Sequence, residues 1–205
     1  MARNMIAIVD YGIGNLGSIQ NMLKKIGARV VITHDPATIA TADKIILPGV
    51  GAFDTAIDSL NKSGLTPLLN DLALEKHRPI LGICLGMQLM TKRSDEGTLP
   101  GLGWLDAETV RFANGSLRIP HMGWNTVDIR REDPLFKDMY EEPRFYFVHS
   151  YYVKCADDSD ISTSTRYGID FCSSFAKGNI RGVQYHPEKS HKFGMLLLKN
   201  FAEMV

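Results

Sequence analysis

The sequence is poor in the features that mark several specialised classes of protein. Its 205 residues include only three cysteines, Cys84, Cys155 and Cys172, at spacings that suit neither a disulfide framework nor a metal site. Basic and acidic residues number 23 each, so no excess charge favours nucleic acid or an anionic membrane as a partner. The apolar run Met5–Val9 is too short for a signal peptide or a membrane span. We therefore expect a soluble cytoplasmic protein that uses no metal.

The chain does contain enough apolar material for one full core. With 44% hydrophobic residues, residues 1–205 fit a single domain. Short apolar runs alternate with helical patterns up to about Thr91, which predicts a parallel sheet covered by helices on both faces. Short β-rich runs follow and predict added antiparallel strands. The expected fold class is therefore α/β, with a central, mostly parallel sheet flanked by helices.

Periodicity and turn residues predict the individual elements. Asn15 is expected to cap the first helix and Gly27 to end it. Hairpin turns are expected at Asn114-Gly115 and at Lys177–Asn179. Strands are expected at residues 5–10, 29–33, 44–47, 79–83, 108–112, 126–130, 145–148, 163–167, 171–176 and 180–184, and helices at 16–26, 52–62, 67–75, 85–92 and 192–203.

The strongest chemical signal is the segment G-I-C-L-G, residues 82–86. It matches the glycine-flanked strand-to-helix turn that carries a nucleophile in hydrolases, with Cys84 in the place of serine. The two glycines permit a tight turn, and the N–H groups at the start of the next helix would face the sulfur. Such N–H groups lower a thiol pKa and contribute to an oxyanion hole. A buried structural cysteine at a strand end is the alternative interpretation.

A second signal, His186-Pro187-Glu188, follows a later apolar strand. A cysteine nucleophile needs a base within hydrogen-bond reach, and the base needs a group that orients it. His186 can be that base, and Glu188 can turn back to its imidazole if Pro187 fixes the bend. Taken alone, each residue is compatible with a structural role. Their occurrence together with the turn at Cys84 favours a catalytic pair.

A third signal is the glycine-rich loop after the strand at 44–47. Gly49, Val50 and Gly51 follow the expected neighbour of the nucleophile strand. Their backbone N–H groups can bind an anion beside Cys84. The alternative is an ordinary strand-to-helix loop that needs positive φ angles.

A competing pattern lies near the start of the chain. Gly12, Gly14 and Gly17 form a G-x-G-x-x-G sequence after a strand, and Asp35 lies near the end of the next strand. This is the context of a dinucleotide-binding fingerprint. However, Asp10 stands directly before the turn, where a phosphate would meet a carboxylate, and the later chain lacks further βαβ repeats. A tight turn before a capped helix is the other interpretation.

The segments P-G-V-G-A-F, G-I-C-L-G-M-Q and V-Q-Y-H-P-E-K-S together resemble those of class I (triad) glutamine amidotransferases. Within this family they are most similar to the glutaminase subunits of imidazole glycerol phosphate synthase. The similarity extends over nearly the whole chain and includes P-H-M-G-W-N and Y-F-V-H-S-Y. It implies the flavodoxin-like fold of the family. Residues 190–195 depart from the pattern, because many histidine-pathway members have smaller side chains there.

The resemblance implies a role for each matching residue. Cys84 would attack the side-chain carboxamide of glutamine, His186 would relay protons, and Glu188 would orient His186. The remaining roles are oxyanion binding by backbone N–H groups of Gly49, Val50, Gly51 and Leu85, contact with the α-amino group of glutamine by Gln88 and Glu96, and contact with its α-carboxylate by Ser150 and Tyr151.

The resemblance also implies a partner and no cofactor. In this family the ammonia passes to a (β/α)8-barrel synthase subunit, held as a heterodimer, which makes imidazole glycerol phosphate in histidine biosynthesis. Asn15 and Trp124 match family positions at that interface, although Trp124 could equally be a core residue. The departure at 190–195 resembles paralogues that supply ammonia to a sugar amidotransferase in surface-polysaccharide synthesis. Both acceptors remain open on the sequence, with the histidine pathway favoured.

Overall fold

The computed structural model describes residues 4–113 and 117–204. Its centre is a set of parallel strands in the order β2-β1-β3-β4-β12, which is the order of flavodoxin-like sheets. This result confirms the expected fold class. The strands are β1 (Met5–Val9), β2 (Arg29–Thr33), β3 (Lys44–Gly49), β4 (Ile80–Cys84) and β12 (Ile180–Val183).

Antiparallel strands extend the sheet beyond β12, as the later β-rich runs predicted. β11 (Ile169–Lys177) forms the expected hairpin with β12, and β10 (Ile161–Tyr167) and β7 (Asp128–Ile129) follow. A branch of the same sheet pairs β11 with β9 (Tyr151–Cys155) and β9 with β5 (Ala107–Arg111). A separate antiparallel pair consists of β6 (His121–Thr126) and β8 (Arg144–His149).

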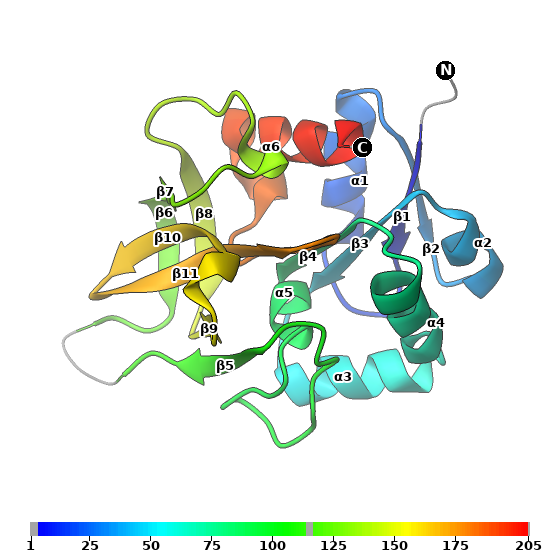
Figure 1. Cartoon of the computed structure of the whole chain (residues 1–205), viewed down its shortest axis with the longest axis horizontal. Coiled ribbons are helices and arrows are strands. Elements are labelled where there is room, and N and C mark those ends of the chain that lie inside the picture. The colour runs from blue at the N-terminus through cyan, green and yellow to red at the C-terminus, as the bar shows by residue number, and fades with distance from the viewer. Residues whose placement is uncertain (1–3, 114–116, 205) are drawn as a thin grey trace.

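Helices cover both faces of the parallel strands (Figure 1). α1 (Leu16–Lys25) and α6 (His191–Glu203) lie on one face, whereas α3 (Phe53–Lys62) and α4 (Thr66–Asn70) lie on the other. Because strand side chains alternate, Ile46 packs in the core beneath α1 and α6, and its neighbours Ile45 and Leu47 pack in the core beneath α3 and α4. Full burial of such side chains contributes about 1.5–3 kcal/mol each. Both faces are therefore apolar, and function is confined to the strand ends.

The helix after Cys84 is shorter than the sequence predicted. α5 spans Leu85–Leu89, whereas the helical pattern extended to residue 92. The carbonyls at the end of the helix accept bonds from a following loop, with Leu102 N–H donating to Leu89 O and Leu105 N–H to Met90 O. The loop at 101–105 therefore satisfies the groups that a longer helix would have used.

Strand β3 is longer than predicted, because Pro48 does not end it. Pro48 and Gly49 still pair with β4, opposite Ile83 and Cys84, while the pairing with β1 stops at Ile46. Ile45 N–H points toward β4, so the N–H that Pro48 lacks would have faced the side where no partner strand continues. The proline therefore costs no ladder hydrogen bond.

Other predictions were incomplete. Asn15 occupies the N-cap of α1, but its side chain makes no capping hydrogen bond. The sequence patterns gave no warning of β6, β9 or α2 (Pro36–Thr41). The hairpin expected at Asn114-Gly115 lies outside the described residues. Within residues 4–113 and 117–204, no helix is both long and apolar enough to cross a membrane.

Candidate active site

The carboxyl ends of three adjacent parallel strands bring the predicted reactive residues together. β3 and β12 flank β4, with Gly49 level with Cys84 and Val183 level with Ile83. A cavity of about 350 Å³ opens at this edge of the sheet. It is lined by Val50, Gly51, Cys84, Leu85, Gln88, Glu96, Pro120, Val148, His149, Ser150, Tyr151 and His186. Nearly all residues predicted for catalysis and glutamine binding therefore meet in one pocket.

Cys84 lies in a strained turn. Its φ of 54° and ψ of −112° place a non-glycine residue in a sparsely populated region. The flanking glycines serve close approach: a Cβ on Gly86 would lie 1.8 Å from Leu47 O, and one on Gly82 would lie 2.8 Å from Gly86 O. The sulfur is thereby presented at the pocket although the residue is only 7% exposed. This geometry fits a nucleophile better than a structural thiol.

His186 and Glu188 form a buried pair beside Cys84. His186 Nδ1 lies 2.8 Å from Glu188 Oε1, and the two side chains are 3% and 1% exposed. Burial lowers the pKa of His186, but its interactions with Cys84 and Glu188 outweigh burial and raise the pKa to about 10. The other ring nitrogen, Nε2, is buried and has no well-aligned hydrogen-bond partner among the described residues. It is therefore the atom able to exchange a proton with the pocket.

The backbone of His186 is fixed by β8. His186 N–H donates to Tyr146 O at 2.9 Å, and Ser190 Oγ donates to His186 O at 2.6 Å. Ser190 Oγ also accepts from Tyr146 N–H at 3.0 Å. The backbone N–H and carbonyl of His186 are thus both bonded, and its ring is bonded to Glu188. The imidazole therefore has little freedom to move away from Cys84.

The glycine-rich loop lies against the start of α5. A Cβ on Gly49 would come within 2.9 Å of Leu85 Cβ, and Tyr11 Oη donates to Pro48 O at 2.5 Å. Gly51 has a φ of +96°, which favours glycine, and Val50 is 42% exposed at the pocket mouth. The loop therefore stands where backbone donors could meet an anion formed beside Cys84.

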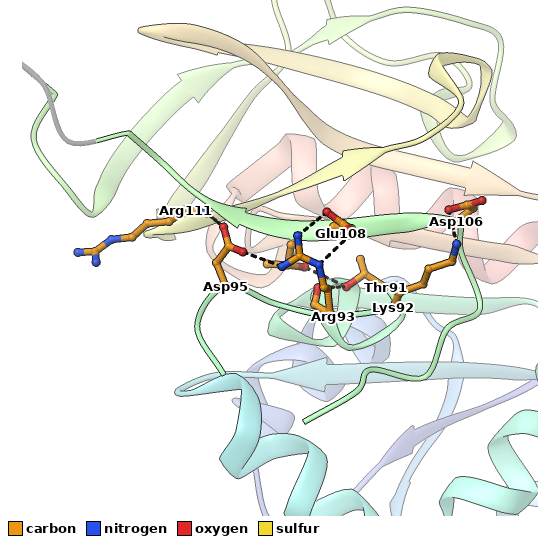
Figure 2. A network of polar contacts seen from close by, with 8 residues as sticks. Thr91, Lys92, Arg93, Asp95, Asp106, Glu108 and Arg111 are labelled. Carbon is orange, nitrogen blue, oxygen red and sulfur yellow. Dashed lines mark hydrogen bonds and ion pairs between the residues drawn. The ribbon is translucent and has the colours of Figure 1, made fainter. Parts of the chain in front are cut away.

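Glu96 reaches the pocket from a loop that is tied at both ends. Phe53 N–H donates to Glu96 Oε2 at 2.9 Å, joining the loop to the start of α3. On the other side, Figure 2 shows Arg93 between Asp95 and Glu108. Its guanidinium contacts Glu108 at 2.7 and 2.9 Å and Asp95 at 3.0 Å. The carboxylate of Glu96 is therefore presented by a loop fastened to β5.

Ser150 and Tyr151 are fastened to the same strand. Phe112 N–H, directly after β5, donates to Ser150 O at 3.2 Å, and Tyr151 pairs with Arg111 in the β5–β9 ladder. Gln88 is joined to this part of the pocket, since its Nε2 donates to Tyr151 O at 3.2 Å. The residues predicted for the two ends of glutamine are thus held by one strand.

These findings agree with comparisons to known proteins. A family model described as glutamine amidotransferase class-I matches residues 7–205. The chain belongs to this family. The resemblance noted in the sequence is thereby confirmed, and the cavity is the candidate active site of a class-I glutamine amidotransferase.

Relatives with similar sequences extend over almost the full chain. The imidazole glycerol phosphate synthase subunit HisH 2 of Methanococcus maripaludis is 52% identical over 198 residues, covering 96% of this chain and 98% of that protein. Subunit HisH 2 of Pseudomonas aeruginosa is 49% identical, covering 98% and 100%. Subunit HisH of Bdellovibrio bacteriovorus is 46% identical, covering 98% and 100%.

Solved structures share the fold at low sequence identity. PurLQS from Thermotoga maritima superposes with a TM-score of 0.76 at 16% identity, covering 97% of both chains. The crystal structure of a glutamine amidotransferase gives a TM-score of 0.72 at 18% identity, covering 94% of this chain and 98% of that one. These likenesses support the amidotransferase fold.

Gln184 was missed by the sequence analysis. Its side chain is fully buried, its Nε2 lies 3.8 Å from Cys84 Sγ, and its Oε1 accepts from Gln88 Nε2 at 2.9 Å. The strand register explains the contact, because Val183 is level with Ile83 and the next residue on each strand is Gln184 or Cys84. Aligning the two strand ends would have found this residue of the amidotransferase site.

Asn15 and Trp124 lie outside the pocket. Asn15 is exposed at the start of α1, and Trp124 is 47% exposed on β6, so the alternative of a core tryptophan is wrong. The ring of Trp124 packs 5.4 Å from that of His191. Both residues are therefore accessible on the surface of the amidotransferase.

The glycine pattern near the start of the chain forms a turn that is closed by an internal hydrogen bond. Gly12 N–H donates to Asp10 Oδ1 at 3.1 Å. Asp35, which the dinucleotide hypothesis needed for a ribose, caps α2 instead by accepting from Thr38 N–H at 2.9 Å. The geometry and the family therefore give the dinucleotide alternative no support. In the described part of the chain, no cluster of three or more His, Cys, Asp or Glu residues could hold a metal ion.

Proposed function

We propose that this chain is the glutaminase subunit of an imidazole glycerol phosphate synthase, acting as one domain in histidine biosynthesis. The observation that carries the proposal is the strained Cys84 beside the buried His186–Glu188 pair, at the ends of adjacent parallel strands. The full-length similarity to HisH subunits supports the pathway. This subunit would hydrolyse glutamine to glutamate and ammonia.

The raised pKa of His186 indicates the resting state of the reaction. An imidazolium beside Cys84 favours the thiolate, which attacks Cδ of the glutamine side chain. The carbonyl π electrons move to the oxygen, and the tetrahedral oxyanion forms. His186 then gives its Nε2 proton to the departing nitrogen, so the C–N bond breaks as ammonia leaves and a glutamyl thioester remains. Neutral His186 next takes a proton from water, whose hydroxide attacks the thioester and releases glutamate and the thiolate.

Backbone donors would stabilise the oxyanion. Leu85 and the loop residues Val50 and Gly51 line the cavity beside Cys84, so their N–H groups could meet the oxyanion. Loss of one such donor typically costs about 10²–10³ in rate. Val50→Pro removes one N–H, so we expect loss of most ammonia release, while Val50→Ala, which keeps it, should stay near wild type. Equal rates for the two variants would remove this residue from the oxyanion hole.

The charges and donors at the far end of the pocket suit an α-amino acid. The Glu96 carboxylate would attract the substrate ammonium, helped by Gln88, whose Nε2 is already engaged and whose oxygen can accept. Ser150 and Tyr151 would hold the α-carboxylate. Because β5 fixes both groups, the distance between them is set by one rigid element. That arrangement would discriminate glutamine from amides without an amino-acid end.

Exposed apolar side chains near the pocket support a docked partner. Val50, Met122 and Trp124 are 42%, 62% and 47% exposed. A (β/α)8-barrel synthase subunit seated over them, with Asn15 and Trp124 at the contact, would form a heterodimer and receive ammonia without loss to water. Trp124→Ala should weaken this association by about 10–100-fold, as expected for an aromatic anchor.

The decisive experiment measures ammonia release from glutamine with and without the barrel subunit and its ribonucleotide ligand. We expect strong stimulation that disappears in Cys84→Ala, whose fold should be intact. Stimulation by a sugar amidotransferase alone would keep the glutaminase but reassign the acceptor to surface-polysaccharide synthesis. No ammonia release with either partner, in protein of wild-type melting temperature, would overturn the glutaminase proposal.

A further inference from the structure

Two buried histidines join the pocket to strand β6. His121 on β6 and His149 on β8 are 3% and 6% exposed and form a pair, with His121 Nδ1 lying 2.9 Å from His149 Nε2. At one end, His149 Nδ1 lies 2.7 Å from Tyr151 O, in the glutamine pocket. At the other, His121 Nε2 lies 3.1 Å from Asn125 Nδ2. None of these three side chains takes part in the mechanism above.

The partners fix where every proton lies. A carbonyl can only accept, so His149 must carry its proton on Nδ1 and donate it to Tyr151 O. His149 Nε2 is then the acceptor, so His121 must carry its proton on Nδ1. His121 Nε2 in turn accepts from the amide of Asn125. The hydrogen-bond chain formed by these groups therefore has one direction of donation, from Asn125 to the carbonyl of Tyr151.

The Asn125 end of this hydrogen-bond chain has all of its side-chain groups paired. Asn125 Nδ2 also donates to Arg166 O at 3.1 Å, and Asn125 Oδ1 accepts from Thr126 N–H at 2.9 Å, which fixes the orientation of the amide. Aromatic rings hold the imidazoles in place. His121 stacks between Phe147 and Tyr167 at centroid distances of 4.7 and 4.0 Å, and His149 packs against Phe112 and Phe171 at 5.4 and 5.3 Å.

We propose that Asn125, His121 and His149 are positioning residues that hold the Tyr151 carbonyl, and with it the carboxylate-binding end of the glutamine pocket. This inference rests on the proposed glutaminase function. Tyr151 O receives a second bond from Gln88 Nε2, so the peptide is held from two sides. Asn125 is the residue after Trp124 on β6. The hydrogen-bond chain therefore also connects the glutamine pocket to the strand proposed to meet the partner.

The environment keeps both rings neutral, as the chain requires. Burial lowers the pKa of His121 to about 4 and that of His149 to about 3, although the bond to Tyr151 O opposes the second shift. A protonated imidazole has two donors and no acceptor, so it would break the link between the two rings.

The test measures glutamine binding by calorimetry in Cys84→Ala protein, which cannot turn the substrate over. Adding His149→Phe keeps the aromatic packing and removes the donor, so we expect about tenfold weaker binding. Adding His149→Asn places an amide N–H near the former Nδ1 and should restore much of the affinity. Phe171→Leu is the matched control, because it disturbs packing on His149 without removing a hydrogen bond.

Nitrogen-15 NMR of the wild-type chain gives an independent readout. We expect both His121 and His149 as neutral Nδ1–H tautomers at pH 7. An Nε2–H tautomer of either ring would overturn the inference, as would equal glutamine affinity in the His149→Phe and Phe171→Leu proteins. If the Cys84→Ala parent binds no glutamine, the proposed function fails and the inference falls with it. If the parent binds but His149→Phe changes nothing, only the inference fails.

Discussion

The reactive side of the pocket and its substrate-holding side are built from different parts of the sheet. Cys84 and Gly49 stand level at the ends of β4 and β3, and His186 follows shortly after the end of the adjacent strand β12. Glu96 and Ser150 stand on loops bonded to β5 or to the residue after it, and Tyr151 begins β9, which pairs with β5 in an antiparallel branch of the sheet. The first side is therefore fixed by parallel ladders at the sheet centre, and the second by one antiparallel ladder together with loop hydrogen bonds.

The two sides should differ in how well they tolerate substitutions. Changes at the strand ends meet backbone atoms that cannot move, so they affect folding and chemistry together. Changes at the loops that carry Glu96 and Ser150 meet exposed or half-exposed groups, so they should affect the affinity for glutamine more than the rate. Substitutions on each side can test that division.

The largest effect is expected at the turn beneath Cys84. Gly86→Ala would place a Cβ 1.8 Å from Leu47 O, so we expect it to destabilise the fold by about 3 kcal/mol or more. Gly17→Ala is the matched control, because its Cβ would meet nothing within 4 Å and alanine is the better helix former. Denaturant unfolding measures both. Similar stabilities would show that the strand ends are less rigid than described.

A smaller effect on chemistry alone is expected at Gln184. Gln184→Leu removes the donor 3.8 Å from Cys84 Sγ, so kcat should fall about tenfold. Steady-state release of ammonia from glutamine measures the effect. Gln20→Leu on α1 makes the same change away from the pocket and should leave kcat at the wild-type value. An unchanged kcat in the Gln184 variant would mean that this amide only fills space.

The titration of His186 tests whether Glu188 raises its pKa. The folded pKa of about 10 lies above the unfolded value, so the protonated ring stabilises the fold fully below about pH 6.5, and this contribution is lost as the pH rises through 10. Glu188→Gln removes a carboxylate that raises the pKa, so the NMR titration midpoint of His186 should fall. The slope of stability between pH 7 and 10 should flatten with it. A midpoint unaffected by the substitution would contradict the assigned pairing.

The smallest effect is expected at Arg93, on the substrate-holding side. Its guanidinium joins Asp95 to Glu108 but is 54% exposed, so the network should contribute little to stability. Arg93→Gln should raise KM for glutamine about threefold by loosening the loop before Glu96, with kcat almost unchanged. Lys92→Gln, which breaks the neighbouring pair with Asp106, should leave KM at the wild-type value. A large fall in kcat for Arg93→Gln would contradict the division between the two sides.

Much of the reactive side could be predicted from local sequence. The glycine-flanked Cys84 and the spacing of His186 and Glu188 follow from turn geometry and from the needs of a nucleophile and its base. Gln184 could not be found that way, because its role depends on the register between β12 and β4. The length of α5 was also missed, because N–H groups of the later residues Leu102 and Leu105 bond to the carbonyls of Leu89 and Met90. The dinucleotide alternative, against which Asp10 already stood, finds no ribose ligand in Asp35, because that residue caps a helix that the sequence had not revealed.

The α/β class, the strands of the parallel sheet and the residues able to act as nucleophile and base could be read from the sequence, because these depend on periodicity and on turn chemistry. Its motifs also carried the resemblance that named Gln88, Glu96, Ser150 and Tyr151. Three features needed the folded structure: Trp124 is exposed, Gln184 contacts Cys84, and His121 and His149 join β6 to Tyr151. Those contacts join residues far apart in the chain, and their existence depends on strand register and loop closure, which no local pattern encodes.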